Sequence, residues 1–312
     1  MKTTFSEALK NQDLKAIRES PKSDLHNHCL MGGKLRHMEK FYGKKIDRFR
    51  NAQKGIQSIN DWIVNSYRPV FDKTGAFDQA IVAAFLQAKS DGVTVLEMSM
   101  DASIPGLLNI PAEKVIVTLQ YYHKAVAPEI KFLPEIGLAR NLPVRLLLAY
   151  VEPFIDSRYF KSIDLYDDES AQPLQNFDKI YRYAKSMGLK LKAHAGEFND
   201  AAFVKQSVEI LDLDVVQHGI AAADSDKVMR WLANHKIQLN VCPASNIALK
   251  RTKSYKTHPI RILYDNGIKV TVNTDDVMLF GKGNSEQYLQ LYKCGLFKAE
   301  ELDEIRKNGL LP

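Results

Sequence analysis

The sequence predicts an α/β protein, a (β/α)8 barrel of the TIM-barrel type with a helical insertion after its first strand. Two observations predict it: short, nearly continuous apolar runs that are typical of strands buried on both faces, and helix-like segments between most of them. Eight strands with intervening helices in 312 residues suit such a barrel. The predicted strands are 23–29, 93–100, 144–151, 162–166, 189–197, 215–219, 238–243 and 269–276.

The segments between these strands show helical periodicity, and three of them end at a glycine, the residue that most often stops a helix. The predicted helices are 77–92, 112–129, 173–188, 225–236 and 258–267. The stretch 34–76 is long, polar and aromatic for a single connection, so we expect a helical insertion over the barrel mouth.

The alternative fold is an open, doubly wound sheet. Its usual phosphate-binding signatures are absent, because no GxGxxG follows a strand and no GxxxxGK[ST] occurs. The sequence contains no linker rich in proline, glycine or serine and no internal repeat. We therefore expect residues 1–312 to form one barrel domain.

Composition is that of a globular protein, and the expected partner is a small-molecule substrate. Basic residues exceed acidic ones by only six, and their scatter favours neither a nucleic acid nor a membrane as partner. The most basic stretch, 250–256, is expected to be a solvated loop, with a phosphate site as the alternative. Three widely spaced cysteines suggest a reducing, cytoplasmic setting, and 1–20 is expected to be a short surface helix, not a signal peptide. The sequence indicates no oligomeric state.

Reactive side chains gather at the carboxyl ends of the predicted strands, where barrel enzymes carry their chemistry. In an extended strand, residues i and i+2 face the same side, so His26 and His28 would project together. The other histidines are expected to be structural or exposed: His37, His123, His235 and His258. The residues at strand ends are His26, His28, His194, Glu197, His218, Asp275 and Asp276.

Three imidazoles and one carboxylate suit a catalytic Zn²⁺ that keeps one position open, although iron, cobalt or manganese also accept such donors. A second metal ion would need a bridging ligand, which in related two-metal barrels is a modified lysine at the end of strand four. The corresponding segment here, 162–169, ends in acidic residues and has no lysine there. We therefore expect one metal ion per chain.

The motifs DLHNH, AHAGE, QHG, CPASN and NTDD resemble, in order and spacing, those of the adenosine deaminase family of metal-dependent amidohydrolases, over residues 22–310. The resemblance implies one zinc ion, with Glu197 as the proton shuttle. It also implies that His218 and Asp276 position and activate the attacking water, with Asp276 near the purine as well. The implied zinc ligands are His26, His28, His194 and Asp275.

The chain departs from this family where the substrate is bound. Family members usually carry an acidic residue before the glycine that follows the HxH motif, but here Met31 precedes Gly32. Asp167 occupies the place of a glycine in the strand-four motif. We expect Met31, Gly32, Asp167 and Asp276 to contact the substrate and adenosine to be a poor one. Lys250 and Arg251 are weaker candidates for contacts to an anionic group.

These observations predict a zinc-dependent hydrolytic deaminase of a 6-aminopurine nucleoside, base or related aminated heterocycle, which releases ammonia. One alternative is an amidohydrolase of another C–N bond, such as a cyclic amide. Glu197 disfavours it, since protonation of a ring nitrogen needs an acid at that place. The other alternative is a non-catalytic binding protein, which would be expected to have lost a ligand or Glu197, and both are present.

Overall fold

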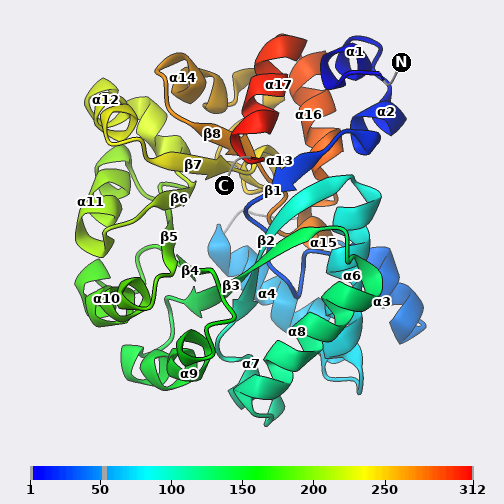
Figure 1. Cartoon of the computed structure of the whole chain (residues 1–312), viewed down its shortest axis with the longest axis vertical. Coiled ribbons are helices and arrows are strands. Elements are labelled where there is room, and N and C mark those ends of the chain that lie inside the picture. Colours follow the sequence, from blue (N-terminus) through cyan, green and yellow to red (C-terminus); the bar gives the residue numbers. More distant parts are fainter. Residues whose placement is uncertain (1–2, 51–54, 311–312) are drawn as a thin grey trace.

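The computed structural model describes residues 3–50 and 55–310, and within them eight parallel strands pair in chain order (Figure 1). The strands are β1 Lys22–Asp24, β2 Val93–Asp101, β3 Lys131–Ala139, β4 Ser162–Tyr166, β5 Lys190–Ala195, β6 Val215–His218, β7 Gln238–Val241 and β8 Val270–Val272. Beyond the last strand, a parallel bridge joins Asn27 to Asp275, and the Leu25 amide donates to Asn273 Oδ1 at 2.8 Å. These contacts bring β8 back to β1, which confirms the predicted (β/α)8 barrel.

Helices surround the barrel, and at least one follows each strand (Figure 1). The longer ones are α6 Ala76–Ser90, α8 Ala112–Val126, α9 Val144–Asp156, α10 Asp178–Ser186, α11 Ala201–Leu211, α12 Asp226–Asn234, α14 Ile260–Asp265, α16 Asn284–Lys293 and α17 Ala299–Asn308. Short segments at the connections are α7 Ile104–Leu108, α13 Pro243–Ala248 and α15 Val277–Phe280, with 3-10 turns at η2 Leu174–Phe177, η3 Ile220–Asp224 and η4 Tyr255–Thr257. None of the described helices combines the length and apolar character needed to cross a membrane.

The segment after β1 is the predicted helical insertion. It contains α3 Leu35–Tyr42, α4 Ile56–Trp62, the π-helical turn η1 Ile63–Tyr67 and α5 Arg68–Phe71. In Figure 1, α4 lies near the centre of the barrel. The part of the insertion at 51–54 falls outside the described residues.

The prediction for the third strand was wrong. The apolar run 144–151 belongs to helix α9, which begins after Pro143, and the strand is β3, upstream of it. Leucine and alanine in that run are good helix formers, and a proline is well placed at the start of a helix. Proline and glycine disfavour a strand, and β3 contains Pro134 and Gly137. The Pro134 carbonyl nevertheless accepts a hydrogen bond from the Lys161 amide at 2.8 Å. The number of strands was right and the position of one was not.

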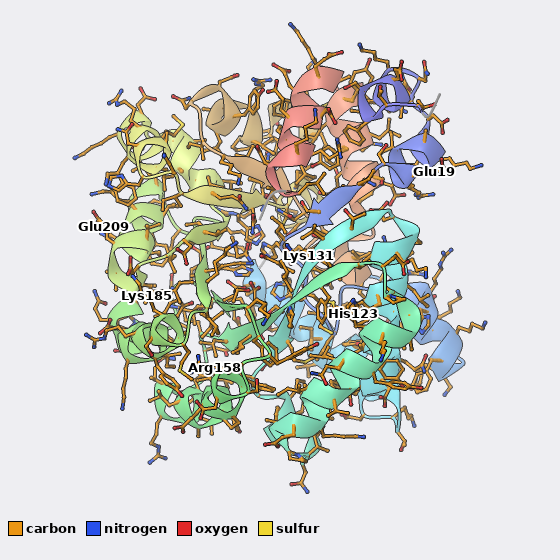
Figure 2. The ribbon with its side chains drawn as sticks, in the orientation of Figure 1. Glu19, His123, Lys131, Arg158, Lys185 and Glu209 are labelled. Atoms are coloured by element: carbon orange, nitrogen blue, oxygen red, sulfur yellow. The ribbon has the colours of Figure 1, made fainter. Side chains whose placement is uncertain are left out.

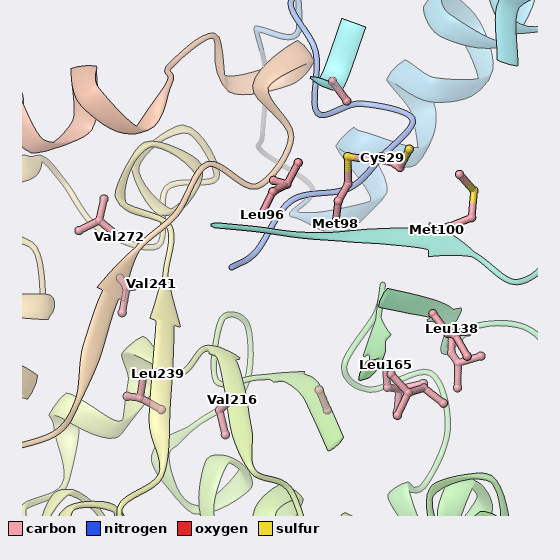
Figure 3. Packing of buried hydrophobic residues seen from close by; sticks show 14 of the residues in the cluster. Cys29, Leu96, Met98, Met100, Leu138, Leu165, Val216, Leu239, Val241 and Val272 are labelled. Atoms are coloured by element: carbon pink, nitrogen blue, oxygen red, sulfur yellow. The ribbon is translucent and has the colours of Figure 1, made fainter. Parts of the chain in front are cut away.

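Successive side chains of each strand alternate between the helix-facing side and the interior side of the barrel wall. Figure 3 shows Leu96, Met98 and Met100 of β2 among the buried apolar side chains. The residues between them face inward, where Glu97 pairs with Lys192 of β5. Lys192 also lies 2.6 Å from a carboxylate oxygen of Glu135 on β3. The apolar face therefore packs under the helices, while the interior is polar.

The amino-terminal segment forms two helices, α1 Phe5–Lys10 and α2 Leu14–Glu19, and not a single surface helix. Phe5 is buried, and its ring meets that of Tyr288 edge-on, with centroids 5.3 Å apart. These helices therefore pack beside α16 and α17 (Figure 1). Charged side chains such as Lys185 and Glu209 lie at the outer rim (Figure 2).

Candidate active site

Three histidines from two separate strand ends meet at the barrel mouth. One ring nitrogen from each of His26, His28 and His194 lies within 4.8 Å of the others. The His26 ring is 1% exposed, and neither of its nitrogens has a hydrogen-bond partner among the residues that the structure describes. A buried polar atom without a partner is rare in folded proteins, so this ring points to a ligand that completes it.

Asp275, just beyond β8, supplies a carboxylate to the same point. Its Oδ1 lies 3.4 Å from His28 Nε2 and 3.8 Å from His26 Nε2. Its Oδ2 lies 3.8 Å from Nε2 of His218, at the end of β6. The structure therefore brings together all four predicted metal ligands, and this set of imidazole and carboxylate donors fits a divalent metal ion.

The backbone turns sharply where these side chains enter the mouth. His218 has φ of 62° and Asp275 has φ of 58°, both in the left-handed region that non-glycine residues seldom adopt. Such a conformation costs of order 1 kcal/mol or more, and it breaks the alternation of side chains along a strand. The surrounding fold fixes these two side chains at the expense of local backbone strain.

His194 is held by a carboxylate that the sequence reasoning missed. Its Nδ1 lies 3.2 Å from Oδ1 of Asp164, which is fully buried on the neighbouring strand β4. A carboxylate behind a ligating histidine fixes the ring orientation and leaves the opposite nitrogen free for a metal. Asp164 lies two residues before the end of its strand. Alternation of side chains along 162–166 places it on the same face as the last residue of the strand, and this was the signal that could have identified it.

Glu197 lies in the cavity beside this cluster, with its side chain buried. Its Oε1 accepts a hydrogen bond from Asn246 Nδ2 at 3.1 Å and is 3.5 Å from His218 Nδ1. Burial, together with the nearby carboxylates of Asp275 and Glu169, raises the pKa of Glu197 well above its usual range. A glutamate in this setting favours the protonated form, as a proton donor requires.

The chain around Glu197 is fixed by Glu169, another residue that the sequence reasoning missed. The Glu169 carboxylate accepts hydrogen bonds from four consecutive amides, those of residues 196–199, at 2.8–3.3 Å. Arg251 Nε donates to the Glu197 carbonyl at 2.7 Å. These contacts fix the position of the Glu197 backbone from both sides.

Behind Asn246 lies His258, which was expected to be structural or exposed. It is buried, its Nε2 is 3.3 Å from Asn246 Oδ1, and its Nδ1 accepts the Ile260 amide at 3.1 Å. Nε2 therefore carries the ring proton. Asn246 in turn reaches both Glu197 and His218, whose Nδ1 is 3.2 Å from Asn246 Nδ2. His258 thus contacts the site through one intermediate side chain.

The remaining three histidines do not reach the mouth. Each has a local partner: His37 Nε2 meets Gln79 Oε1 at 3.0 Å, and His123 Nε2 and His235 Nδ1 each lie 2.8 Å from a backbone carbonyl. A buried thiol does approach the cluster. Cys242 Sγ lies within 4.8 Å of ring nitrogens of His26 and His218. The sequence did not indicate this contact, because Cys242 is far from the other members of the cluster along the chain.

Asp276 is buried beside Asp275 and lines the cavity, and its Oδ1 has no hydrogen-bond partner within residues 3–50 and 55–310. Burial raises the pKa of this carboxyl to about 7, despite the opposing effect of His28. An unpartnered carboxyl oxygen at the cavity surface is available to a bound molecule.

The cavity above these residues has a volume of about 270 Å³. Apolar side chains of the insertion, including Ile56, Ile59 and Ile63, form much of its lining. Of the predicted substrate contacts, Met31, Asp167 and Asp276 line the cavity. Gly32 does not, and instead packs so closely on Asn27 that a Cβ would lie 2.1 Å from Asn27 Oδ1.

The basic segment after β7 lies apart from the cavity. Neither Lys250 nor Arg251 lines it, Lys250 is exposed, and the Arg251 guanidinium lies over the Phe198 ring, 5.3 Å from its centroid. Arg251 is thus already engaged with the backbone and an aromatic ring near Glu197.

Comparisons with known proteins agree with this geometry. The chain is 32% identical over 300 residues to a Treponema pallidum (strain Nichols) protein provisionally named an adenosine/adenine deaminase, covering 96% of this chain and 99% of that one. The crystal structure of adenine deaminase from Arthrobacter aurescens has a TM-score of 0.82 at 22% identity, covering 93% and 92% of the two chains. A zinc-bound amidohydrolase of Burkholderia ambifaria has a TM-score of 0.80 at 21% identity, covering 94% and 85%.

The family assignment rests on the sequence match, since structural likeness at such low identity shows the fold alone. The adenosine deaminase family model matches residues 66–311, most of the chain. The chain therefore belongs to the adenosine deaminase family of hydrolases that act on carbon–nitrogen bonds.

Proposed function

We propose that this protein is a zinc-dependent deaminase that hydrolyses the exocyclic C–N bond of a 6-aminopurine base or nucleoside and releases ammonia. The observation that carries the proposal is the placement of Glu197: a buried glutamate with a raised pKa, in the same cavity as His28, His194 and Asp275. The names of the Treponema and Arthrobacter proteins support an aminopurine as substrate.

The proposed metal site uses His26, His28, His194 and Asp275. When bound there, one zinc ion lowers the pKa of water from ~16 to about 7, so that hydroxide is available near neutral pH. The unpartnered His26 ring and the Asp164 carboxylate behind His194 support this ligand set. The zinc in the Burkholderia structure supports the choice of metal.

Glu197 is the proposed proton donor to the purine. Attack of water at the amine-bearing carbon places electron density on the adjacent ring nitrogen, which an acid can protonate. Because Asn246 donates to Oε1, the proton is expected on Glu197 Oε2. The amine leaves as ammonia after it takes up the proton released by the attacking water, the hydroxyl proton returns to Glu197, and the ring regains aromaticity as a lactam.

His218 and Asp276 are proposed to orient the attacking water. His218 Nδ1 faces Asn246 and Glu197, while its Nε2 faces Asp275, so the ring is fixed between the proton donor and the metal ligands. The free Asp276 Oδ1 can accept a proton from the water or a hydrogen bond from the purine. Fixed groups of this kind stabilise charge as it develops in the transition state.

The direct test is ammonia release by zinc-loaded protein from adenine, adenosine, adenosine monophosphate, other aminopurines and pterins, with metal-free protein as the control. We expect turnover of at least one 6-aminopurine and none without metal. We also expect adenosine to be a poor substrate: Met31 cannot accept a hydrogen bond from a ribose hydroxyl, which costs roughly 1–3 kcal/mol when that hydroxyl is buried. Release of ammonia from none of these compounds would refute the proposal.

A further inference from the structure

The half of the barrel mouth formed by β2–β4 carries a second polar surface that the metal site does not use. We call it the acidic wall; it consists of Ser99, Asp101, Tyr166 and Asp167, all of which line the same cavity as Glu197. Ser99 and Asp101 occupy alternate, inward-facing positions at the end of β2. Tyr166 is the last residue of β4, and Asp167 follows it.

The acidic wall is built across β3, which carries small residues at this level. Tyr166 Oη donates to the Asp101 carboxylate from two strands away. This reach depends on Gly137 between them, because a Cβ there would lie 2.7 Å from Tyr166 Cε1 and 2.5 Å from Ser99 Oγ. The Tyr166 ring also meets the His28 ring edge-on at 5.1 Å, so the acidic wall adjoins the metal ligands.

Two members of the acidic wall have polar atoms available to a ligand. The Ser99 hydroxyl is buried, with the residue 4% exposed, and has no hydrogen-bond partner in the described part of the chain. Asp167 has φ of 80°, and its Oδ1 accepts the Asp168 amide at 2.8 Å, while no hydrogen bond to its Oδ2 is found among the described residues. These groups suit a neutral molecule with hydrogen-bond donors.

Cations are scarce around this surface. Among the described residues that line the cavity, Arg68 is the only lysine or arginine, and its Nε already pairs with Asp72 at 2.5 Å. The amides at the start of α7 are partly occupied as well, because Asp101 Oδ1 accepts the Ser103 amide at 2.6 Å. Phosphate sites usually combine several arginines or lysines with free amides at a helix start, whereas the described lining of this cavity offers Arg68 alone.

We propose that the acidic wall restricts the substrate to uncharged aminopurines, free base or nucleoside, and excludes nucleoside 5′-phosphates. This inference rests on the proposed function and names the substrate class of the same site. A phosphate entering the cavity would lose its hydration and face the carboxylates of Asp101 and Asp167, with Arg68 as the one arginine or lysine among the described lining residues. A neutral purine or nucleoside would instead pair its donors with Asp167 Oδ2 and accept from Ser99 Oγ.

The test compares adenosine with adenosine monophosphate, which differ only in the phosphate. For zinc-loaded wild-type protein we expect kcat/KM for the monophosphate to be lower by on the order of 100-fold. Asp101→Asn and Asp167→Asn each keep the side-chain shape and remove one negative charge. Each is expected to raise the monophosphate-to-adenosine ratio of kcat/KM by roughly tenfold.

Asp168→Asn is the matched control. Asp168 is the next residue in the chain, its carboxylate accepts the Ser170 amide at 2.8 Å, and it does not line the cavity. This variant removes the same charge outside the acidic wall and should leave the ratio unchanged. An equal change in the control would show a general field effect and overturn the proposal, as would unchanged ratios in both acidic-wall variants.

A binding measurement separates this inference from the proposed function. Calorimetry with hypoxanthine, inosine and inosine monophosphate needs no turnover, and we expect the monophosphate to bind at least about tenfold more weakly than the tighter neutral compound. Deamination that is fastest with adenosine monophosphate would overturn the inference and leave the deaminase assignment intact. Absence of both turnover and binding of every purine would overturn the two together.

Discussion

The two halves of the barrel mouth differ in how their polar groups are satisfied. In the metal half, formed by residues after β1, β5, β6 and β8, the His26 nitrogens and an Asp276 oxygen have no partner among the described residues. In the opposite half, formed by β2–β4 and the insertion, Asp101 is already bonded to Tyr166 and Ser103. The free atoms of the metal half are ring nitrogens and a carboxylate oxygen, which suit a metal ion and its substrate, whereas in the opposite half Asp101 is satisfied and Ser99 Oγ is free among the described residues.

This difference indicates a division of labour between reaction and selection. The metal half holds residues in strained backbone, such as His218 and Asp275, which persists only where the surrounding structure enforces it. The opposite half carries apolar insertion residues and the acidic wall, and neither group includes a proposed metal ligand or the proposed proton donor. Substitutions in the first half should abolish turnover, and those in the second should change which compound is turned over.

The largest expected effect follows from removing a ligand. His194→Ala should lose the metal and with it measurable turnover, because losing even an outer partner of a ligand costs about 10–100-fold in affinity. Elemental analysis should find about one zinc per wild-type chain and almost none in the variant. His235→Ala, which alters an exposed histidine bonded to the Trp231 carbonyl, should keep both metal and activity. Two ions per wild-type chain, or full occupancy in His194→Ala, would contradict the site.

The next effect separates chemistry from metal binding. Glu197→Gln should retain zinc but lose about 10²–10⁴-fold in kcat, the usual contribution of a general acid. Glutamine matches the shape of glutamate and can keep the contact with Asn246, but it has no proton of suitable acidity. Glu209→Gln on the outer rim is the control. Near-normal kcat in Glu197→Gln on the best substrate would remove Glu197 from the mechanism.

A smaller loss is expected when the group behind Glu197 is removed. Asn246→Ala should keep the metal and lower kcat by roughly tenfold, since one hydrogen bond that positions a catalytic side chain is lost. Steady-state kinetics with metal analysis on the same sample provides the measurement. A raised KM with unchanged kcat would instead assign Asn246 to substrate binding.

The smallest effect concerns stability in acid. Burial lowers the pKa of His258 to about 3, so below its unfolded value of about 6.5 the unfolded chain takes up a proton that the folded chain refuses. Its contribution to stability is therefore present above pH ~6.5 and lost as the pH falls toward 3, by up to about 2 kcal/mol at pH 5.

Urea unfolding of His258→Gln should accordingly depend less on pH between 7 and 5 than unfolding of the wild type. His235→Gln is the control, because His235 lies on the surface and its stability contribution should not follow this pattern. Equal pH dependence in the wild type and His258→Gln would mean that His258 is not kept neutral by the fold.

The sequence located the candidate residues of the metal half because their signal is local. Polar and ligand-type residues stand directly after apolar strands, and parallel strands bring their carboxyl ends to one place. His26, His28, His194 and Asp275 were found in this way, and the structure brings them together. The strand that was misplaced, β3, contributes no ligand, so the error did not disturb the predicted site.

The residues that were missed act over distances that no local pattern records. Glu169 holds four amides of another connection, His258 acts through Asn246, and Asp101 is reached by a tyrosine two strands away. The last of these contacts also depends on Gly137, which leaves room for the Tyr166 ring. Periodicity and propensity describe single elements, so such pairings appear only once the barrel is assembled.

The central claim, that one half of the mouth performs the reaction and the other selects the substrate, is tested most directly by one comparison. Glu197→Gln and Asp101→Asn are measured together for zinc content and for kcat/KM on adenosine and adenosine monophosphate. We predict that both keep the metal, that Glu197→Gln loses activity on both compounds in equal proportion, and that Asp101→Asn shifts their ratio toward the monophosphate. A changed ratio in Glu197→Gln, or a proportional loss on both compounds in Asp101→Asn, would contradict the division.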